Sequence, residues 1–381
     1  MKIYIFHAPA GHGHKKVAEV LQQKFLSRGL NKEEVKVFDS LAYTPWIFRH
    51  SYPGTYYCAV KFLPKVWGAC YETLDVASIY SLARPFRSFF NILNGHKLLS
   101  LAESENPDVI ICTHFFTAEL FAAAKRKGKL KAKILTIITD FFPHTFWVNE
   151  GTDFYWVMSE EGKEALQKRG VPASKIIVGG IPVEDAFKPS GRKNEILQKY
   201  GFESNRFTIL LTSGSFGFGA QEAILQELKA FANRIQCFVV CGNNEKLRDQ
   251  LTPQEKEWGF PCRVFGFVNF MPELMEASDL VIAKSGGSTT TETLVKGIPM
   301  VVMDPIPGQE SRNAALLKAR STSFFMHQPS QLRPILQAIF EQPALLPMKH
   351  RAIQELARPH AADDFVTFTL KQIKNDSVPI V

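Results

Sequence analysis

The chain has 381 residues, of which 45% are hydrophobic, and it carries a formal net charge of +8. This length allows two domains of ordinary size, each able to bury its own core. The apolar runs are of strand length and fall short of the roughly 18 to 20 residues that span a bilayer. The start, MKIYIFHAPA, lacks the apolar core of a secretory signal. Six cysteines without a C-x-x-C pair suit reduced thiols in a cytosol. We therefore expect a cytoplasmic protein, soluble or peripheral to a membrane.

Basic charge gathers in the first half of the chain. Residues 1–180 contain 23 Lys and Arg against 16 Asp and Glu. Residues 43–99 hold 13 of the 45 aromatic residues, with six basic residues and only two acids. Interleaved aromatic and basic side chains suit an anionic membrane interface, although an aromatic-rich core with a solvated basic face gives the same pattern. Nucleic acid is disfavoured as a partner because no recognition motif accompanies the charge.

Strands alternate with helical patterns along the whole chain, which predicts an α/β fold with parallel sheets and helices on both faces. The first strand leads through the turn PAGHGH into a helix ended by Gly29. The strands expected in the first half span residues 2–8, 35–39, 107–114, 132–140, 154–159 and 175–182. Those expected in the second half span residues 207–212, 237–242, 262–267, 279–283, 300–306 and 322–326.

The polar, turn-rich stretch of residues 183–205 is interpreted as a linker. We expect an N-terminal domain at residues 1–185 and a C-terminal domain at residues 186–360. A tail helix at residues 361–381 is expected to pack on the first domain. Two open parallel sheets should hold ligands at the carboxyl ends of their strands, with a cleft between the domains.

The turn after the first strand places His14 at a helix N-terminus. Such a position disfavours the imidazolium, so the ring stays neutral and able to accept a proton. We interpret His14 as a general base, with a polar helix cap as the alternative. His12, between two glycines, is the weaker candidate. Asp140, at the end of the fourth strand, would orient His14 or an acceptor hydroxyl, and capping of a turn is its alternative role.

Residues 284–313, KSGGSTTTETLVKGIPMVVMDPIPGQESRN, have the pattern of a nucleotide-sugar site. Gly287 lets the backbone approach a ligand closely. Ser288 and Thr289 open a helix whose unpaired N–H groups suit a diphosphate. Glu292 lies one turn further, where a carboxylate would take the hydroxyls of a ribose.

The same stretch has simpler interpretations. Thr289 and Glu292 have the spacing of a capping box, which would satisfy the helix's own donors, and the glycine pair alone would suit a tight turn. A cap, however, needs no second polar loop. Here Gln309 and Glu310 follow the next strand and offer an amide and a carboxylate to sugar hydroxyls.

Two further loops of the second half are weaker candidates. Gly214 and Ser215 lie in a glycine-rich turn between a strand and a helix, which is a phosphate-binding pattern but a weak one on its own. Val268 follows the strand VFGF, where backbone amides would read the edge of a base before a helix near Met271.

Three motifs, occurring in this order, resemble the glycosyltransferases of family 28, in the branch of the monogalactosyldiacylglycerol synthases and the processive diacylglycerol glucosyltransferases. They are GHGHKKVAE, the segment from TDFFPHTFW to GGIPVEDAF, and KSGGSTTTETLVKGIPMVVMDPIPGQESRN. The likeness covers most of residues 1–320. The first motif reads AGHGH where a run of two or three glycines is usual, and KSGGST stands where many members have a proline before the second glycine.

The resemblance implies the GT-B fold, with two Rossmann-like parallel-sheet domains facing across a cleft. It implies a UDP-sugar donor in the C-terminal domain and a diacylglycerol or glycosyl-diacylglycerol acceptor in the N-terminal domain. The implied roles are His14 as base, Val268 for uracil, Ser288 and Thr289 for the diphosphate, Glu292 for the ribose, and Gln309 and Glu310 for the donor sugar.

We therefore expect an inverting enzyme that makes glycolipid at the inner face of the cell membrane. Glucose and galactose remain equally open as the transferred sugar. No divalent metal is expected to be essential, because backbone N–H donors would hold the leaving diphosphate. The alternatives are a GlcNAc transferase acting on a polyprenyl-linked acceptor, a nucleotide-sugar epimerase, and a non-catalytic nucleotide-sugar sensor.

Overall fold

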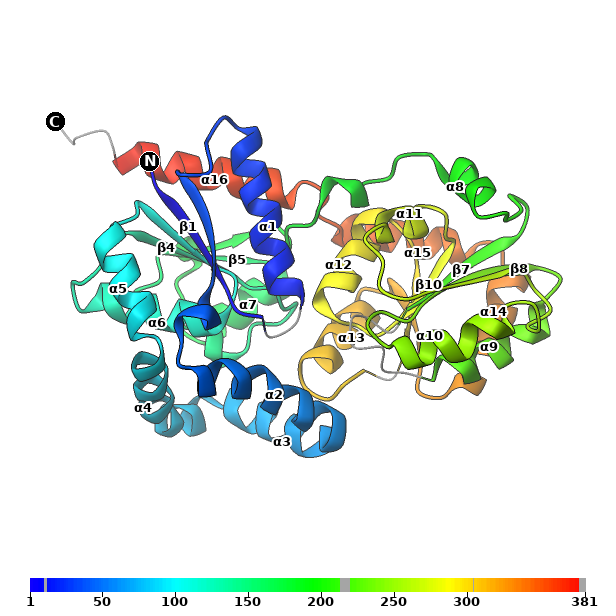
Figure 1. Cartoon of the computed structure of the whole chain (residues 1–381), viewed down its shortest axis with the longest axis horizontal. Coiled ribbons are helices and arrows are strands. Elements are labelled where there is room, and N and C mark those ends of the chain that lie inside the picture. The colour runs from blue at the N-terminus through cyan, green and yellow to red at the C-terminus, as the bar shows by residue number, and fades with distance from the viewer. Residues whose placement is uncertain (10–11, 213–219, 304, 377–381) are drawn as a thin grey trace. The chain divides into compact units, whose positions relative to one another are not determined.

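The computed structural model describes residues 1–9, 12–212, 220–303 and 305–376 and divides into two α/β units (Figure 1). The first unit comprises Met1–Val183, Pro307–Gln309 and His360–Val381, and the second comprises Glu184–Ile306 and Glu310–Pro359. The interpretation of residues 183–205 as a linker is wrong for most of that stretch. It contains helix α8 (Lys193–Lys199), whose apolar Ile196 and Leu197 are buried in the second unit.

The first unit is built on a six-stranded parallel sheet in the order β2-β1-β3-β4-β5-β6. Its strands are β1 (Ile3–His7), β2 (Val35–Asp39), β3 (Val109–Cys112), β4 (Lys133–Ile137), β5 (Phe154–Val157) and β6 (Ile176–Val178). Ile3 of β1 pairs with Val35 on one side and with Val109 on the other. These strands are almost entirely apolar and most of their side chains are buried, as expected for a parallel sheet covered on both faces.

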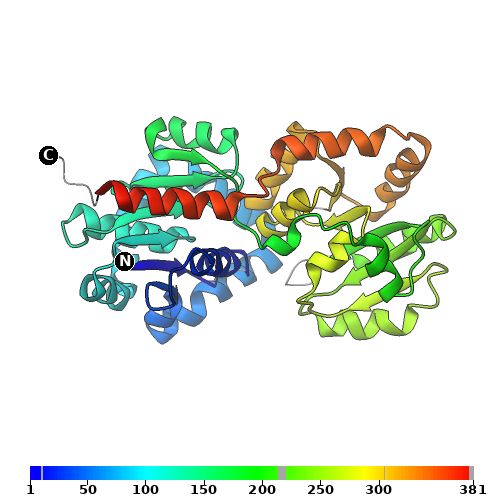
Figure 2. The same cartoon turned by 90° about the horizontal axis from the view of Figure 1, so that it is seen from above.

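Helices cover this sheet on both faces: α1 (His12–Ser27), α5 (His96–Glu105), α6 (Phe115–Arg126), α7 (Glu160–Lys168) and the C-terminal α16 (Ala361–Asp376). Gly29, at a φ of 93° that favours glycine, follows the end of α1. Helix α16 runs along the first unit beside α1 (Figures 1 and 2). Lys24 of α1 forms an ion pair with Asp363 at 2.9 Å, and the rings of Trp156 and Phe365 are 5.1 Å apart, so polar and apolar contacts both hold the last helix to this unit.

Three consecutive helices are inserted between β2 and β3: α2 (Trp46–Phe62), α3 (Pro64–Asp75) and α4 (Ala77–Asn94). They lie together at one end of the first unit (Figure 1). They carry most of the large exposed apolar side chains of the described chain: Trp46, Ile47, Phe62, Val66, Ile79, Leu82, Phe86, Phe89, Phe90 and Leu93. Phe48 is buried in the core of this unit and Tyr80 is also buried, so the described aromatic residues of this region divide between buried and exposed positions.

The second unit has a six-stranded parallel sheet in the order β12-β11-β10-β7-β8-β9. Its strands are β7 (Phe207–Thr212), β8 (Ile235–Val240), β9 (Cys262–Phe265), β10 (Leu280–Ala283), β11 (Met300–Met303) and β12 (Ser323–Met326). The main helices are α9 (Gln221–Leu228), α10 (Glu245–Leu251), α11 (Met271–Glu276), α12 (Gly287–Lys296), α13 (Gln309–Ala319), α14 (Leu332–Glu341) and α15 (Leu345–Leu356). No described helix combines the length and the apolar character that crossing a membrane requires.

Candidate active site

Each sheet has one point at which the strand order reverses, and parallel sheets bind ligands there, beyond the carboxyl ends of the strands. In the first sheet the reversal lies between β1 and β3. His14 stands on α1, which follows β1, and His114 stands directly between β3 and α6. Their rings are 4.7 Å apart, edge to face. The sheet therefore brings two histidines together that are 100 residues apart in sequence.

His14 is held through one ring nitrogen. Its Nδ1 lies 2.7 Å from the carbonyl oxygen of Thr113 and 2.9 Å from the hydroxyl of Thr139. A carbonyl oxygen only accepts, so Nδ1 carries the proton and Nε2 carries the lone pair. Burial lowers the pKa of His14 to about 4. The sequence predicted a neutral ring because of the helix terminus, and the structure supports a neutral ring with burial as the main cause.

Asp140 lies beyond the carboxyl end of β4 and directly follows Thr139, whose hydroxyl contacts His14. It is buried, and its carboxylate accepts a hydrogen bond of 3.0 Å from Nε1 of Trp147. The Trp147 ring is 6.4 Å from the His14 ring. Asp140 therefore positions an aromatic wall of the site, while Thr113 and Thr139 hold the His14 ring itself.

A cluster around Asp75 joins α3 to the loop that follows Asp140. The Asp75 carboxylate accepts hydrogen bonds from the Thr145 amide at 2.7 Å and from Arg169 at 2.6 Å. Burial would raise the pKa of Asp75, but His144, Thr145 and Arg169 together hold it at about 2. Sequence reasoning missed this cluster, because its members lie 70 and 94 residues from Asp75 and no local motif links them.

In the second sheet the reversal lies between β7 and β10. Gly214 and Ser215, predicted to bind phosphate after β7, lie outside the described residues. After β10, helix α12 begins at Gly287 with Gly286 as its N-cap. Because that cap has no side chain to bond the first amides, the N-terminus of α12 offers N–H donors and a positive dipole end.

The capping-box interpretation of Thr289 and Glu292 is wrong. Helix α12 starts two residues before Thr289, so the N-cap is Gly286 and makes no side-chain cap bond. The Ser288 hydroxyl instead donates to the Glu292 carboxylate at 2.8 Å. Glu292 is buried within the first two turns of the helix, beside the half-buried Ser288.

Hydrogen bonds join the start of α12 to the start of α13. Ser285 donates to the backbone oxygen of Glu310 at 2.7 Å, and Asn313 donates to the backbone oxygen of Ser285 at 2.8 Å. The Glu310 carboxylate accepts from the Ile306 amide at 2.9 Å. Gln309 is the first residue of α13. The two ends of the sequence motif thus meet at the carboxyl edge of β10 and β11.

Val268 is half-buried and lies three residues beyond the end of β9 at Phe265, so the strand is shorter than predicted. Helix α11 begins at Met271, as predicted. Among the residues that the structure describes, no cluster of three or more His, Cys, Asp or Glu side chains is arranged to hold a metal ion.

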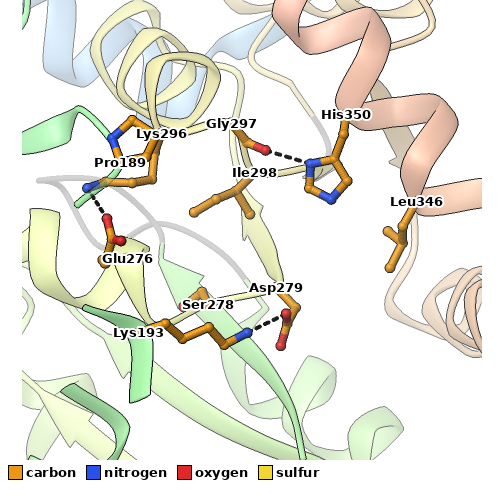
Figure 3. Close-up of a pocket in the computed structure, with 10 residues that line it drawn as sticks. All are labelled: Pro189, Lys193, Glu276, Ser278, Asp279, Lys296, Gly297, Ile298, Leu346 and His350. Atoms are coloured by element: carbon orange, nitrogen blue, oxygen red, sulfur yellow. Dashed lines mark hydrogen bonds and ion pairs between the residues drawn. The ribbon is translucent and has the colours of Figure 1, made fainter. Parts of the chain in front are cut away.

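A pocket of about 220 Å³ lies at the opposite, amino edge of the second sheet, beside Asp279 and Ile298 (Figure 3). Its charged side chains are already paired: Lys193 with Asp279, and Lys296 with Glu276 at 2.7 Å. This pocket contains none of the predicted site residues. Its ion pairs hold α8 and α11 to the sheet and to α12.

Solved structures define the class of fold. The chain matches HepE from Anabaena, solved in complex with UDP, with a TM-score of 0.58 and 14% identity over 98% of this chain and 100% of the other. It matches MurG from Acinetobacter baumannii with a TM-score of 0.62 and 16% identity over 97% and 100% of the two chains. A UDP-GlcNAc 2-epimerase from Neisseria meningitidis gives a TM-score of 0.62 at 15% identity, covering 97% and 100%. The predicted GT-B fold is confirmed.

Sequence comparison defines the family. The monogalactosyldiacylglycerol (MGDG) synthase family matches residues 14–183, and the glycosyltransferase family 28 C-terminal domain matches residues 208–352. The chain belongs to glycosyltransferase family 28, in the branch of these synthases. A processive diacylglycerol beta-glucosyltransferase of Bacillus thuringiensis is 26% identical over 100% of this chain and 96% of the relative. The enzyme of that name from Bacillus cereus strain B4264 is 27% identical over 97% and 94%.

Proposed function

We propose that the protein transfers a hexose, glucose or galactose, from a UDP-sugar to diacylglycerol or glycosyl-diacylglycerol at a membrane surface, with inversion at the anomeric carbon. The observation that carries this proposal is the tautomer of His14, whose Nδ1 donates to Thr113 and whose Nε2 is left with a lone pair. The Bacillus relatives are named as diacylglycerol glucosyltransferases, and these names support a lipid as the acceptor. The UDP complex of HepE supports the donor.

The reaction needs a base on one side of the anomeric carbon and a charge-stabilising group on the other. Nε2 of His14 takes the proton of the acceptor hydroxyl, and the acceptor oxygen forms its bond to the anomeric carbon. The bond from that carbon to the diphosphate oxygen breaks, and UDP leaves with the electron pair. The N–H donors at the start of α12 stabilise the charge that develops on the diphosphate. This step does not depend on a divalent metal.

The remaining predicted residues take donor-binding roles in this proposal. Glu292 accepts the ribose hydroxyls while it keeps its bond from Ser288. Val268 offers backbone groups to the uracil. Gln309 and Glu310, the first two residues of α13, bind the sugar. Asp140 keeps Trp147 against the acceptor side.

The surface of α2, α3 and α4 supports action at a membrane. Phe86 and Phe89 are 80% and 70% exposed, and burying such a side chain is favourable by roughly 1.5–3 kcal/mol. Arg49 and Lys65 are exposed on the same three helices, where cations meet anionic headgroups. Of the two acids in this region, Asp75 is neutralised by Arg169.

The decisive experiment incubates the protein with each of several UDP-sugars and with vesicles that contain diacylglycerol or, separately, a polyprenyl-linked acceptor, followed by analysis of the lipids. A β-linked glycosyl-diacylglycerol formed from an α-linked donor is the expected product. Transfer only to a polyprenyl-linked acceptor would instead assign the GlcNAc-transferase alternative. Conversion of one UDP-sugar into another without lipid would assign the epimerase alternative. UDP binding without any turnover would assign the sensor.

A further inference from the structure

Helix α4 buries polar side chains and exposes apolar ones, which is the reverse of the pattern in an ordinary surface helix. Its buried residues are polar: Tyr80, Asn91 and Asn94. Five of its large apolar residues are more than half exposed: Leu82, Phe86, Phe89, Phe90 and Leu93. Together with Arg87, whose side chain is 18% exposed, the buried residues are seven, four and three residues apart. The exposed residues also recur at intervals of three, four or seven, so each set forms a stripe along one face. This pattern suits a helix whose exposed face contacts an apolar medium and whose buried face contacts a polar site.

The inner stripe is centred on an ion pair with α6. Nη2 of Arg87 lies 2.6 Å from Oε2 of Glu119, and Nδ2 of Asn91 donates to the same oxygen at 2.7 Å. The side chains of Arg87 and Glu119 are 18% and 5% exposed. The guanidinium also lies over the Phe146 ring, 4.3 Å from its centre. The pair has no net charge and is enclosed by aromatic rings.

Several polar atoms around this pair are buried and make no hydrogen bond within the described part of the chain. They are Nε and Nη1 of Arg87, Oε1 of Glu119, the Tyr80 hydroxyl and Nε2 of His114. Burying such a group without a partner costs about 1–3 kcal/mol. Five such atoms at one place indicate a site that holds oxygen atoms from water or from a ligand.

The chemistry of these atoms defines what fits. Nδ1 of His114 accepts a hydrogen bond from the Phe116 amide at 3.1 Å, so its Nε2 carries a proton and donates. Arg87 also donates, whereas Oε1 of Glu119 only accepts. A group that accepts several hydrogen bonds and donates at least one, such as an alcohol beside ester or ether oxygens, satisfies this set.

The site is adjacent to the proposed base. The His114 ring is in edge contact with the His14 ring at 4.7 Å. The Phe115 ring, next along the chain, lies 5.7 Å from Trp147. The outer stripe of α4 is therefore exposed, while Arg87 of its inner stripe lies 5.8 Å from the centre of the Phe115 ring, next in sequence to His114.

We propose that Arg87, Glu119, Tyr80 and His114 bind the neutral, hydroxyl-bearing headgroup of the acceptor lipid. The paired charges of Arg87 and Glu119 leave no net positive charge for a phosphate, so the site selects uncharged glycerol or sugar hydroxyls over a phosphorylated headgroup. Oε1 of Glu119 accepts from a hydroxyl, and Arg87 and His114 donate to neighbouring oxygens. This inference rests on the proposed transfer to a glycerolipid.

The test is the kinetics of Glu119→Gln in mixed micelles. The acceptors are diacylglycerol and, separately, glucosyl-diacylglycerol, which distinguishes glycerol from sugar hydroxyls. Loss of a charge-assisted hydrogen bond should raise the KM of at least one acceptor tenfold or more. The KM of the UDP-sugar should stay within twofold of wild type. Arg87→Lys, which keeps the charge but loses the planar fork, should shift the same constant in the same direction.

Asp153→Asn is the matched control. Asp153 also forms an ion pair in the first unit, with Lys125, and accepts from the Ile134 amide at 2.7 Å, but at the amino edge of the sheet. It should leave the acceptor KM unchanged. A folded Glu119→Gln variant with wild-type acceptor KM values would overturn the headgroup site. Equal increases in the acceptor KM and in the UDP-sugar KM would also overturn it. If Glu119→Gln does not fold, Arg87→Lys decides alone by the same criteria. Absence of transfer to either lipid by the wild-type protein would instead refute the proposed function.

Discussion

Nδ1 of His14 lies 2.7 Å from the carbonyl oxygen of Thr113, a contact between the first turn of α1 and the end of β3. This bond determines which nitrogen of the ring is protonated, and it leaves the lone pair on Nε2. The order of the strands therefore fixes the tautomer of the proposed base, because the pairing of β1 with β3 brings His14 and Thr113 together.

Replacement of His14 should separate catalysis from donor binding. His14→Asn keeps an N–H near the position of Nδ1 but has no base, so transfer should fall by roughly 10²- to 10⁴-fold. UDP binding, measured by calorimetry, should stay near wild type. His350→Asn is the control, since that exposed histidine also bonds a backbone oxygen through Nδ1, at 2.8 Å. Transfer by His14→Asn at the wild-type rate would refute the role of base.

The acidic limb of the pH profile should reflect the lowered pKa of His14. Burial lowers this pKa to about 4, and the neutral ring is the active form. We expect kcat/KM to change little from pH 7 to about 5 and to fall as the pH approaches 4. A limb centred near 6.5, the ordinary histidine pKa, would contradict this environment for the base.

Stability must be followed in the same experiment. A histidine whose folded-state pKa is lowered contributes stability above its unfolded-state pKa of about 6.5. That contribution is lost progressively as the pH falls from about 6.5 toward 4. Circular dichroism at each pH therefore separates loss of activity from loss of fold.

The sequence predicted the strands because each is a short apolar run bounded by turns, and burial on both faces of a parallel sheet produces that pattern. It predicted His14 and the residues around Gly287 because the loops after strands hold ligands in such sheets. It did not predict the contact of Arg87 with Glu119. Those residues are 32 positions apart on different helices, and their pairing depends on how α4 packs against α6.

Glu292 should control affinity for the donor. Glu292→Gln keeps the shape of the side chain but weakens acceptance from ribose hydroxyls and from Ser288. We expect the KM of the UDP-sugar to rise about tenfold, which corresponds to about 1.4 kcal/mol, while the acceptor KM stays constant. Glu273→Gln, an ion-paired glutamate of α11 in the same unit, should change neither constant. An altered acceptor KM with an unchanged donor KM would exclude this role for Glu292.

Chelation of divalent metals should leave transfer largely intact. The N–H groups at the start of α12, where the N-cap Gly286 makes no side-chain bond, would stabilise the leaving diphosphate as fixed donors, which a chelator does not remove. Initial rates with excess EDTA should therefore stay within about twofold of the untreated rate. A loss of activity that added Mg²⁺ or Mn²⁺ restores would show that a metal shares this task.

The outer stripe of α4 should control vesicle binding rather than folding. Phe86 and Phe89 are 80% and 70% exposed, so the double change to Ser removes little packing and should leave the melting temperature nearly unchanged. Insertion of each ring into the membrane is expected to contribute roughly 1.5–3 kcal/mol to the free energy of vesicle binding. Binding to anionic vesicles in a flotation assay should therefore fall at least tenfold. Added salt should weaken the remaining vesicle binding, because surface charges are screened.

Met348→Ser is the matched control for this experiment. Met348 is 63% exposed in the second unit, so its replacement should leave vesicle binding unchanged. If the Phe86 and Phe89 double variant binds vesicles as well as wild type, α4 does not contact the membrane, and membrane binding does not explain its exposed apolar residues.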